Sequence, residues 1–145
     1  MRVWIPVVIS AFLFGCNSTP SYNKSSLDKF VVKQDKDKWN VIMLVEPLAN
    51  KLPSEPYEGC VNLEFVVGSN GKPQDIVVKK SFPDNQMIAN TITSFSKSKF
   101  VAGKSNPKSA PMVSNLIFTF DNATRKGATS MNVFRTSDVT SNCEV

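Results

Sequence analysis

The sequence predicts an α+β fold, in which a small antiparallel sheet in the order strand, strand, helix, strand carries one helix packed on one face. Two observations carry this prediction. Residues 59–80 show strand alternation on both sides of the turn sequence GSNGKP, and residues 112–120 return to the same alternation after a stretch of helical periodicity.

The hairpin is predicted from every second residue being apolar before the turn, with polar Asn62 and Glu64 between: Val61, Leu63, Phe65 and Val67. Asn70 and Gly71 are expected to supply the positive φ angles of a tight turn. A second strand is expected from about residue 75 to 80, with Ile76 and Val78 on one face.

A helix is expected after Pro83, with Asp84 as N-cap. Its buried face is predicted from three- and four-residue spacing: Met87, Ile88, Ile92, Phe95 and the aliphatic stem of Lys99. Residues 103–111 are expected to form a loop, and residues 112–120 a strand with Leu116, Phe118 and Phe120 inward. The apolar run 39–47 fits either a buried strand or a helical turn.

The N-terminus has the features of a bacterial lipoprotein. Residues 1–15 form a predicted signal peptide, because the apolar run after Arg2 is shorter than the 20 or so residues that span a bilayer. Residues 13–16, LFGC, resemble a lipobox, in which Cys16 receives the lipid. An ordinary secretory signal with an incidental cysteine is the alternative.

Three parts are expected after cleavage: a flexible tether over 16–38, a domain over 39–122 and a polar tail over 123–145. The formal charge of +5 comes from lysines spread over the whole chain, which indicates a solvated surface. Attraction to an acidic envelope surface stays open. Nucleic acid is not an expected partner, because export is predicted and no binding motif is present.

With Cys16 assigned to lipid, Cys60 and Cys143 remain as a pair in an oxidising compartment. A disulfide between them would clip the tail back onto the sheet, and residues 131–134 would then be a candidate added strand. Two free thiols are the alternative. A metal site is not expected, because the chain has no histidine and too few soft ligands for zinc.

Residues 46–122 resemble the C-terminal domain of TonB-type energy transducers. The segment EGCVNLEFVVGSNGKPQDIVVKKSF is similar to the hairpin of that family, with the turn at residues 70–73. Phe100 stands at the last aromatic of the family helix, NLIFTF at its last strand, and Pro47 and Ala49 within its short proline-containing helix. Ser98 and Ala102 replace the tryptophan and proline usual near Phe100.

The resemblance implies a protein that binds a partner by adding an extended peptide to an exposed sheet edge. The edge is expected at the last strand, where four side chains face away from the core: Val113, Asn115, Ile117 and Thr119. The partner is an envelope protein, with a TonB-dependent receptor or a motor component as the specific candidates. Force transmission is not expected, because the tether lacks the length and proline content of the family's rod.

Three functions therefore follow as expectations: an envelope lipoprotein with a partner-binding domain, an auxiliary component of TonB-dependent uptake, or a structural lipoprotein. Asn17 after Cys16 favours the outer over the inner membrane. Enzymatic activity and cofactors are not expected, since the chain has no histidine, no glycine-rich phosphate loop and no nucleophile with a base beside it.

Overall fold

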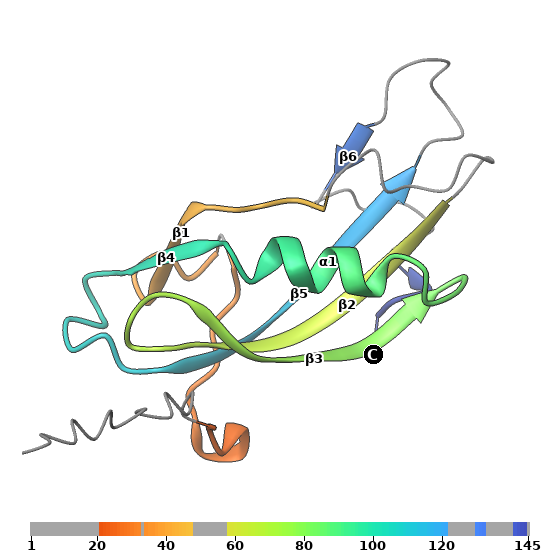
Figure 1. Cartoon of the computed structure of the whole chain (residues 1–145). Helices are drawn as coiled ribbons and strands as arrows, with labels where there is room; N and C mark the ends of the chain where they lie inside the picture. Colours follow the sequence, from red (N-terminus) through yellow and green to blue (C-terminus); the bar gives the residue numbers. More distant parts are fainter. Residues whose placement is uncertain (1–20, 33, 48–57, 122–129, 133–140, 145) are drawn as a thin grey trace, which may run out of the picture.

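The computed structural model describes residues 21–32, 34–47, 58–121, 130–132 and 141–144. Its central sheet has four strands in the order β3-β2-β5-β6, and strands β1 and β4 form a separate two-stranded ribbon. Figure 1 shows helix α1 lying across the four-stranded sheet, with the β1–β4 ribbon beyond one end of the helix. The bounds are β1 Trp39–Met43, β2 Glu58–Val67, β3 Pro73–Phe82, α1 Ile88–Phe95, β4 Lys99–Ala102, β5 Met112–Asp121 and β6 Ser130–Asn132.

The fold class is the predicted one, and β2 and β3 form the predicted antiparallel hairpin. Only Gly71 in its turn has a positive φ, of 71°, so the expectation of a second positive φ at Asn70 was wrong. The turn instead closes through the amide of Gly71, which donates to the carbonyl of Gly68 at 2.8 Å. A Cβ at Gly71 would contact the carbonyl oxygen of Phe100, so glycine is required there for close approach as well as conformation.

Helix α1 is shorter than expected. It begins at Ile88, with Met87 as the N-cap, so the predicted N-cap at Asp84 was wrong. The carboxylate of Asp84 instead accepts the amide of Gln86 in the turn before the helix, at 2.9 Å. Lys99 is not on the helix either, because α1 ends at Phe95 and the chain turns into β4 to pair with β1.

The run beginning at Trp39 is a strand, which decides between the two readings that the sequence left open. Trp39 is 1% exposed, and its indole nitrogen donates to the carbonyl of Ala110 at 3.1 Å. The amide of Val45 donates to the hydroxyl of Ser98, the residue that replaces the family's tryptophan, at 2.9 Å. These two bonds fix the β1 segment against the loop before β5 and the end of α1.

The core lies between α1 and the sheet face formed by β2 and β5. Phe95 of α1 packs with its ring centroid 4.6 Å from that of Phe65 on β2 and 5.6 Å from that of Phe118 on β5. Aromatic pairs at these distances and steep angles add to the stability that apolar burial provides. The small helix is therefore held by tertiary packing, which its serine- and threonine-rich sequence requires.

The opposite face of the sheet is also covered in part, whereas a sheet with one buried face would leave this face open to solvent. On that face of β2, Cys60, Asn62 and Val66 are buried, and Glu64 is half-buried. Residues 21–32 and 141–144 provide this cover. The expectation of a flexible tether over 16–38 is therefore wrong for its described part, because Phe30 and Val32 enter the core.

Candidate partner-binding edge

Strand β5 is the strand on which the sequence predicts partner binding. It pairs with β2 over its whole length without a register shift. Because backbone groups alternate in direction along a regular strand, those of Val113, Asn115, Ile117 and Thr119 point away from β2. The amide and carbonyl of Val113 demonstrate this direction, since both bond to residues outside the sheet.

The first closure of this edge comes from residues 21–32, which we call the strap. Phe30 donates its amide to the carbonyl of Val113 at 3.1 Å, and Val113 donates to the carbonyl of Asp28 at 2.9 Å. The hydroxyl of Ser114 donates to the carbonyl of Phe30 at 2.6 Å. The strap thus adds a short parallel bridge to the edge of β5 at the end where that strand begins.

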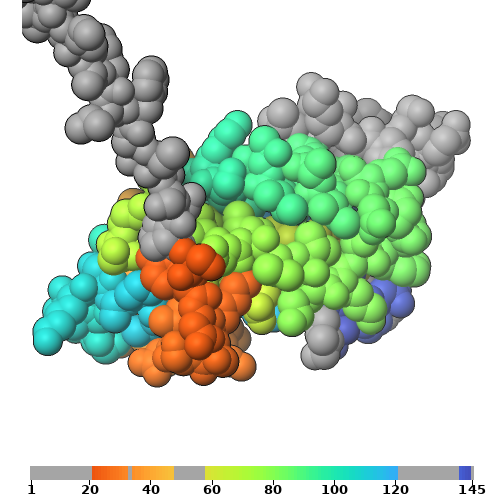
Figure 2. All heavy atoms as spheres, turned by 60° about the horizontal axis from the view of Figure 1, so that its bottom comes forward, coloured from red at the N-terminus to blue at the C-terminus, as the bar shows by residue number. Residues whose placement is uncertain are grey.

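The strap reaches β5 by crossing the outer face of the sheet. Near its start the amide of Tyr22 donates to the carboxylate of Asp75 on β3 at 2.7 Å, and then Lys24 pairs with Glu64 on β2 at 3.2 Å. Figure 2 shows the strap in orange, lying across the front of the molecule. One segment therefore contacts β3, β2 and β5 in succession before Phe30 enters the core.

The second closure of the edge is β6, which pairs antiparallel with Thr119–Asp121 of β5. The sequence predicts an added strand over residues 131–134. The structure has it at Ser130–Asn132, and residues 133 and 134 lie outside the described residues.

Between the two closures lies a window at Asn115 and Ile117, whose edge-facing backbone groups have no hydrogen-bond partner among the described residues. Beside it is a pocket of about 400 Å³ between the strap and β5. Its lining includes apolar Phe30, Val31 and Val113 and charged Lys29, Asp35 and Glu64, together with Ser114 and Asn115. A backbone edge and a side-chain pocket thus occur side by side.

The four predicted edge residues differ in accessibility. Asn115 is exposed and Ile117 is half-buried, so both meet the expectation of an outward position. Val113 is 4% exposed and Thr119 is 8% exposed, and the strap and β6 close the backbone at these two positions, so the expectation of a fully open edge was wrong. Sequence reasoning missed the strap, although its apolar group Phe30–Val32 within a polar segment was the available signal.

Strand β3 forms the other edge of the sheet, and its geometry suits pairing less well. Its register with β2 shifts at two places, and Asp75 has a positive φ of 46°. Lys79 and Lys80 are exposed along it. Bulges and lysines are common protections of edge strands against pairing with other chains.

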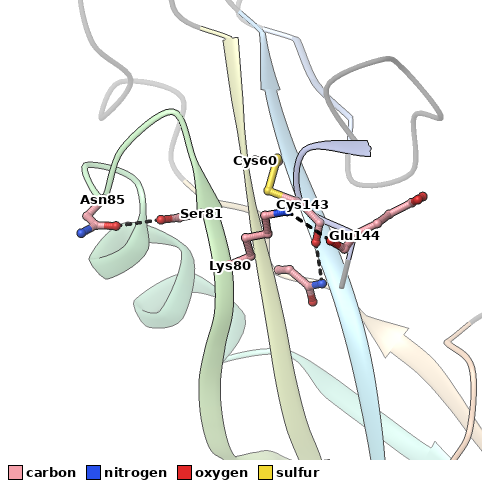
Figure 3. The surroundings of a disulfide bond; sticks show 7 residues. Cys60, Lys80, Ser81, Asn85, Cys143 and Glu144 are labelled. Carbon is pink, nitrogen blue, oxygen red and sulfur yellow. Dashed lines mark hydrogen bonds between the residues drawn. A yellow bond between two sulfur atoms is a disulfide. The ribbon is translucent and has the colours of Figure 1, made fainter.

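A disulfide joins Cys60 of β2 to Cys143, whose Cα atoms are 6.2 Å apart. Figure 3 shows the bond at β2, between β3 and β5; Lys80 of β3 donates through Nζ to the carbonyl of Glu144 at 3.3 Å. The buried amide Nδ2 of Asn62 donates to the carbonyl of Cys143 at 2.8 Å. Ile117 packs against the two cysteines, so the disulfide lies under one end of the window.

The described residues hold no group of three or more potential metal ligands. No helix within the described ranges is long and apolar enough to cross a bilayer. Cys16, the predicted lipidation site, lies outside the described residues.

These features define a small α+β domain with one partly open sheet edge. A sequence model of the family described as Gram-negative bacterial TonB protein C-terminal matches residues 54–121. This segment is therefore a domain of the TonB C-terminal type, which in TonB proteins mediates protein interactions.

Among solved structures, the chain is similar to the solution NMR structure of the TonB C-terminal domain of Pseudomonas aeruginosa. The two share 22% sequence identity with a TM-score of 0.55, and the match covers 66% of this chain and 96% of that chain. A search of curated proteins gives no match.

Proposed function

We propose that the protein is an envelope lipoprotein whose TonB-type domain binds an extended segment of a partner protein at the window of β5. The observation that carries the proposal is the open backbone at Asn115 and Ile117 between two closed positions of one regular strand. Strand addition requires unpaired donors and acceptors on an edge, with pockets for alternate side chains supplying selectivity.

The geometry limits what the window can accept. A guest strand on β5 would pair with the backbone of Asn115 and Ile117, and a side chain on the outer face would enter the pocket beside the strap. The apolar wall of Phe30 and Val31 suits an aliphatic or aromatic group there, and Glu64 lies in the same pocket. A guest strand longer than the window would have to displace the strap or β6.

Anchorage through Cys16 is part of the proposal, with the outer membrane favoured by Asn17. The structure bears on its geometry, because the strap begins at residue 21. The chain from Cys16 to Tyr22 can span at most about 20 Å when fully extended, so a lipid at Cys16 would keep the domain close to its membrane. Cys16→Ser should leave an exported chain unlipidated and remove it from the membrane fraction; unmodified wild-type protein in the soluble periplasm contradicts the assignment.

A structural lipoprotein is the second candidate, and the two closures of the β5 edge favour it. If the strap and β6 remain in place at all times, the edge serves the domain's own stability and recruits no partner. The variants below distinguish this from binding.

The test compares Asn115→Pro with Asn115→Ala. Proline removes the amide donor of residue 115, which points away from β2, so pairing with β2 is retained, whereas alanine keeps the donor and removes only the side chain. Both variants are first checked by circular dichroism, and each is then used to capture proteins from detergent-solubilised envelopes.

Loss of a captured protein with proline but not alanine supports strand addition at the window. Equal capture by both variants contradicts it. A captured TonB-dependent receptor or motor protein would assign the domain to energised uptake. If the wild-type chain captures no protein specifically, the result favours the structural lipoprotein.

A further inference from the structure

The β1–β4 ribbon carries an unusual concentration of exposed apolar side chains. Ile42 is 62% exposed, Val101 47% and Met43 40%, and these are three of the six large hydrophobic residues exposed in the described part of the chain. The ribbon has nine residues in all. Single exposed apolar residues are ordinary on protein surfaces, but a cluster marks an interaction surface.

The pairing register explains why these side chains point outward. Val41 pairs with Phe100, and both pack against the core, so the neighbouring pair Asn40 and Val101 faces the other way. The register shifts between Val41 and Met43, which leaves Ile42 at the irregularity and pairs Met43 with Lys99. The outward face of the ribbon is therefore both apolar and positively charged.

Further lysines surround the apolar cluster. Lys97 precedes β4, and the amide of Gly103 donates to the carbonyl of Lys38 at 2.9 Å, which places the turn containing Lys36 beside the end of β4 next to Lys104. None of these exposed lysines forms an ion pair with another described residue: Lys36, Lys97, Lys99 and Lys104. The acidic residues near the ribbon, Asp35, Asp37 and Glu46, are fewer than these lysines, so the patch is net positive.

The ribbon also lies near the place where the strap begins. The amide of Phe100 donates to the carbonyl of Gly71 at 2.9 Å, so β4 adjoins the β2–β3 turn. Asp75, which accepts the amide of Tyr22, is only four residues beyond Gly71. The chain from Cys16 to Tyr22 spans at most about 20 Å, which is less than the diameter of such a domain, about 30 Å. A lipid at Cys16 would therefore keep the membrane on the side of the domain where the strap begins.

We propose that the outward face of the β1–β4 ribbon docks on an anionic phospholipid surface. Ile42, Met43 and Val101 enter the interfacial region, and the surrounding lysines contact lipid phosphates, as in other basic amphipathic surfaces. An anionic lipid surface is proposed because the patch is net positive. The proximity of a membrane rests on the proposed function, since it requires the lipid anchor at Cys16.

The test uses an unlipidated chain starting at Asn17, which contains every described element. Its co-sedimentation is measured with vesicles of phosphatidylethanolamine and phosphatidylglycerol, and with vesicles of neutral phosphatidylcholine. The variant is Ile42→Asn with Val101→Asn. The matched control is Val77→Asn, because Val77 on β3 is also 47% exposed but lies outside the ribbon. Circular dichroism verifies the fold of each.

We expect the anionic vesicles alone to bind the chain, with the bound fraction falling at least about fivefold in the ribbon variant and remaining unchanged in the control. No binding of the wild-type chain, or equal binding of variant and control, overturns the proposal. A dimer that the ribbon variant abolishes, without any vesicle binding, assigns the face to a second copy instead. Asn115→Pro should retain vesicle binding. The experiments can therefore contradict partner binding at the window and lipid docking at the ribbon independently of each other.

Discussion

The strap and residues 141–144 both lie on the outer face of the sheet, and they are held there by different forces. The strap is held by hydrogen bonds to Val113 and Ser114 and by burial of the Phe30 ring, which lies 6.3 Å from that of Phe100. The C-terminal segment is held by the covalent bond between Cys60 and Cys143. Attachment of the tail therefore depends on the redox state, whereas attachment of the strap depends only on noncovalent contacts.

This difference has a consequence for the edge of β5. The strap closes the edge by noncovalent contacts, which can break and re-form without a change in any covalent bond. The tail, in contrast, stays attached at Cys143 as long as the compartment is oxidising. If one closure yields to a guest strand in the envelope, we expect it to be the strap. Separate removal of each attachment tests this comparison.

The largest effect is expected from loss of the disulfide. Cys60→Ser combined with Cys143→Ser frees a chain segment with a sequence separation of 83 residues. In the chain-entropy account this lowers the free energy of unfolding by about 4 kcal/mol. Urea unfolding of the double variant against the oxidised wild type measures it. Alkylation of both thiols in the native wild-type protein, detected by mass spectrometry, would contradict the bridge itself.

A slightly smaller effect is expected for Phe30→Ala, which removes the anchor of the strap. Phe30 is 3% exposed, and truncation of a buried phenylalanine costs about 3 kcal/mol. Hydrogen exchange at the amide of Val113 should accelerate more than exchange at Ser114, whose amide points toward β2. Lys29→Ala serves as control, because Lys29 is exposed. Unchanged protection of Val113 in Phe30→Ala would mean that the strap does not depend on this ring.

The smallest effect is expected for Lys24→Gln, which removes one of two lysine partners of Glu64. The two side chains of the pair are 21% and 26% exposed, and Lys79 lies 3.7 Å from the other oxygen of Glu64. A pair at the surface contributes about 0.5 kcal/mol or less, so the unfolding midpoint should hardly change. A loss comparable to that of Phe30→Ala would show that charge, not the aromatic ring, holds the strap.

The sequence alone determined the elements whose signals are local. Alternation over residues 61–67 and 112–120 defined β2 and β5, and the three- and four-residue spacing around Ile88, Ile92 and Phe95 located α1, because side-chain periodicity follows directly from backbone geometry. The pairing of Cys60 with Cys143 could be proposed by counting thiols once Cys16 was assigned elsewhere. The family resemblance over the hairpin was likewise readable from the residues.

Only the tertiary structure decided which parts of the β5 edge are open. The pattern at Val113 and Thr119 is the same as at Asn115 and Ile117, since alternation distinguishes the faces of a strand but not the neighbours along its edge. One neighbour is the strap, which is far from β5 in sequence, and the other is β6, which follows β5 in the chain. Phe30 packs in the core beside Phe100. The sequence of the strap, a polar segment with one aromatic residue in its apolar group, does not by itself predict that packing site.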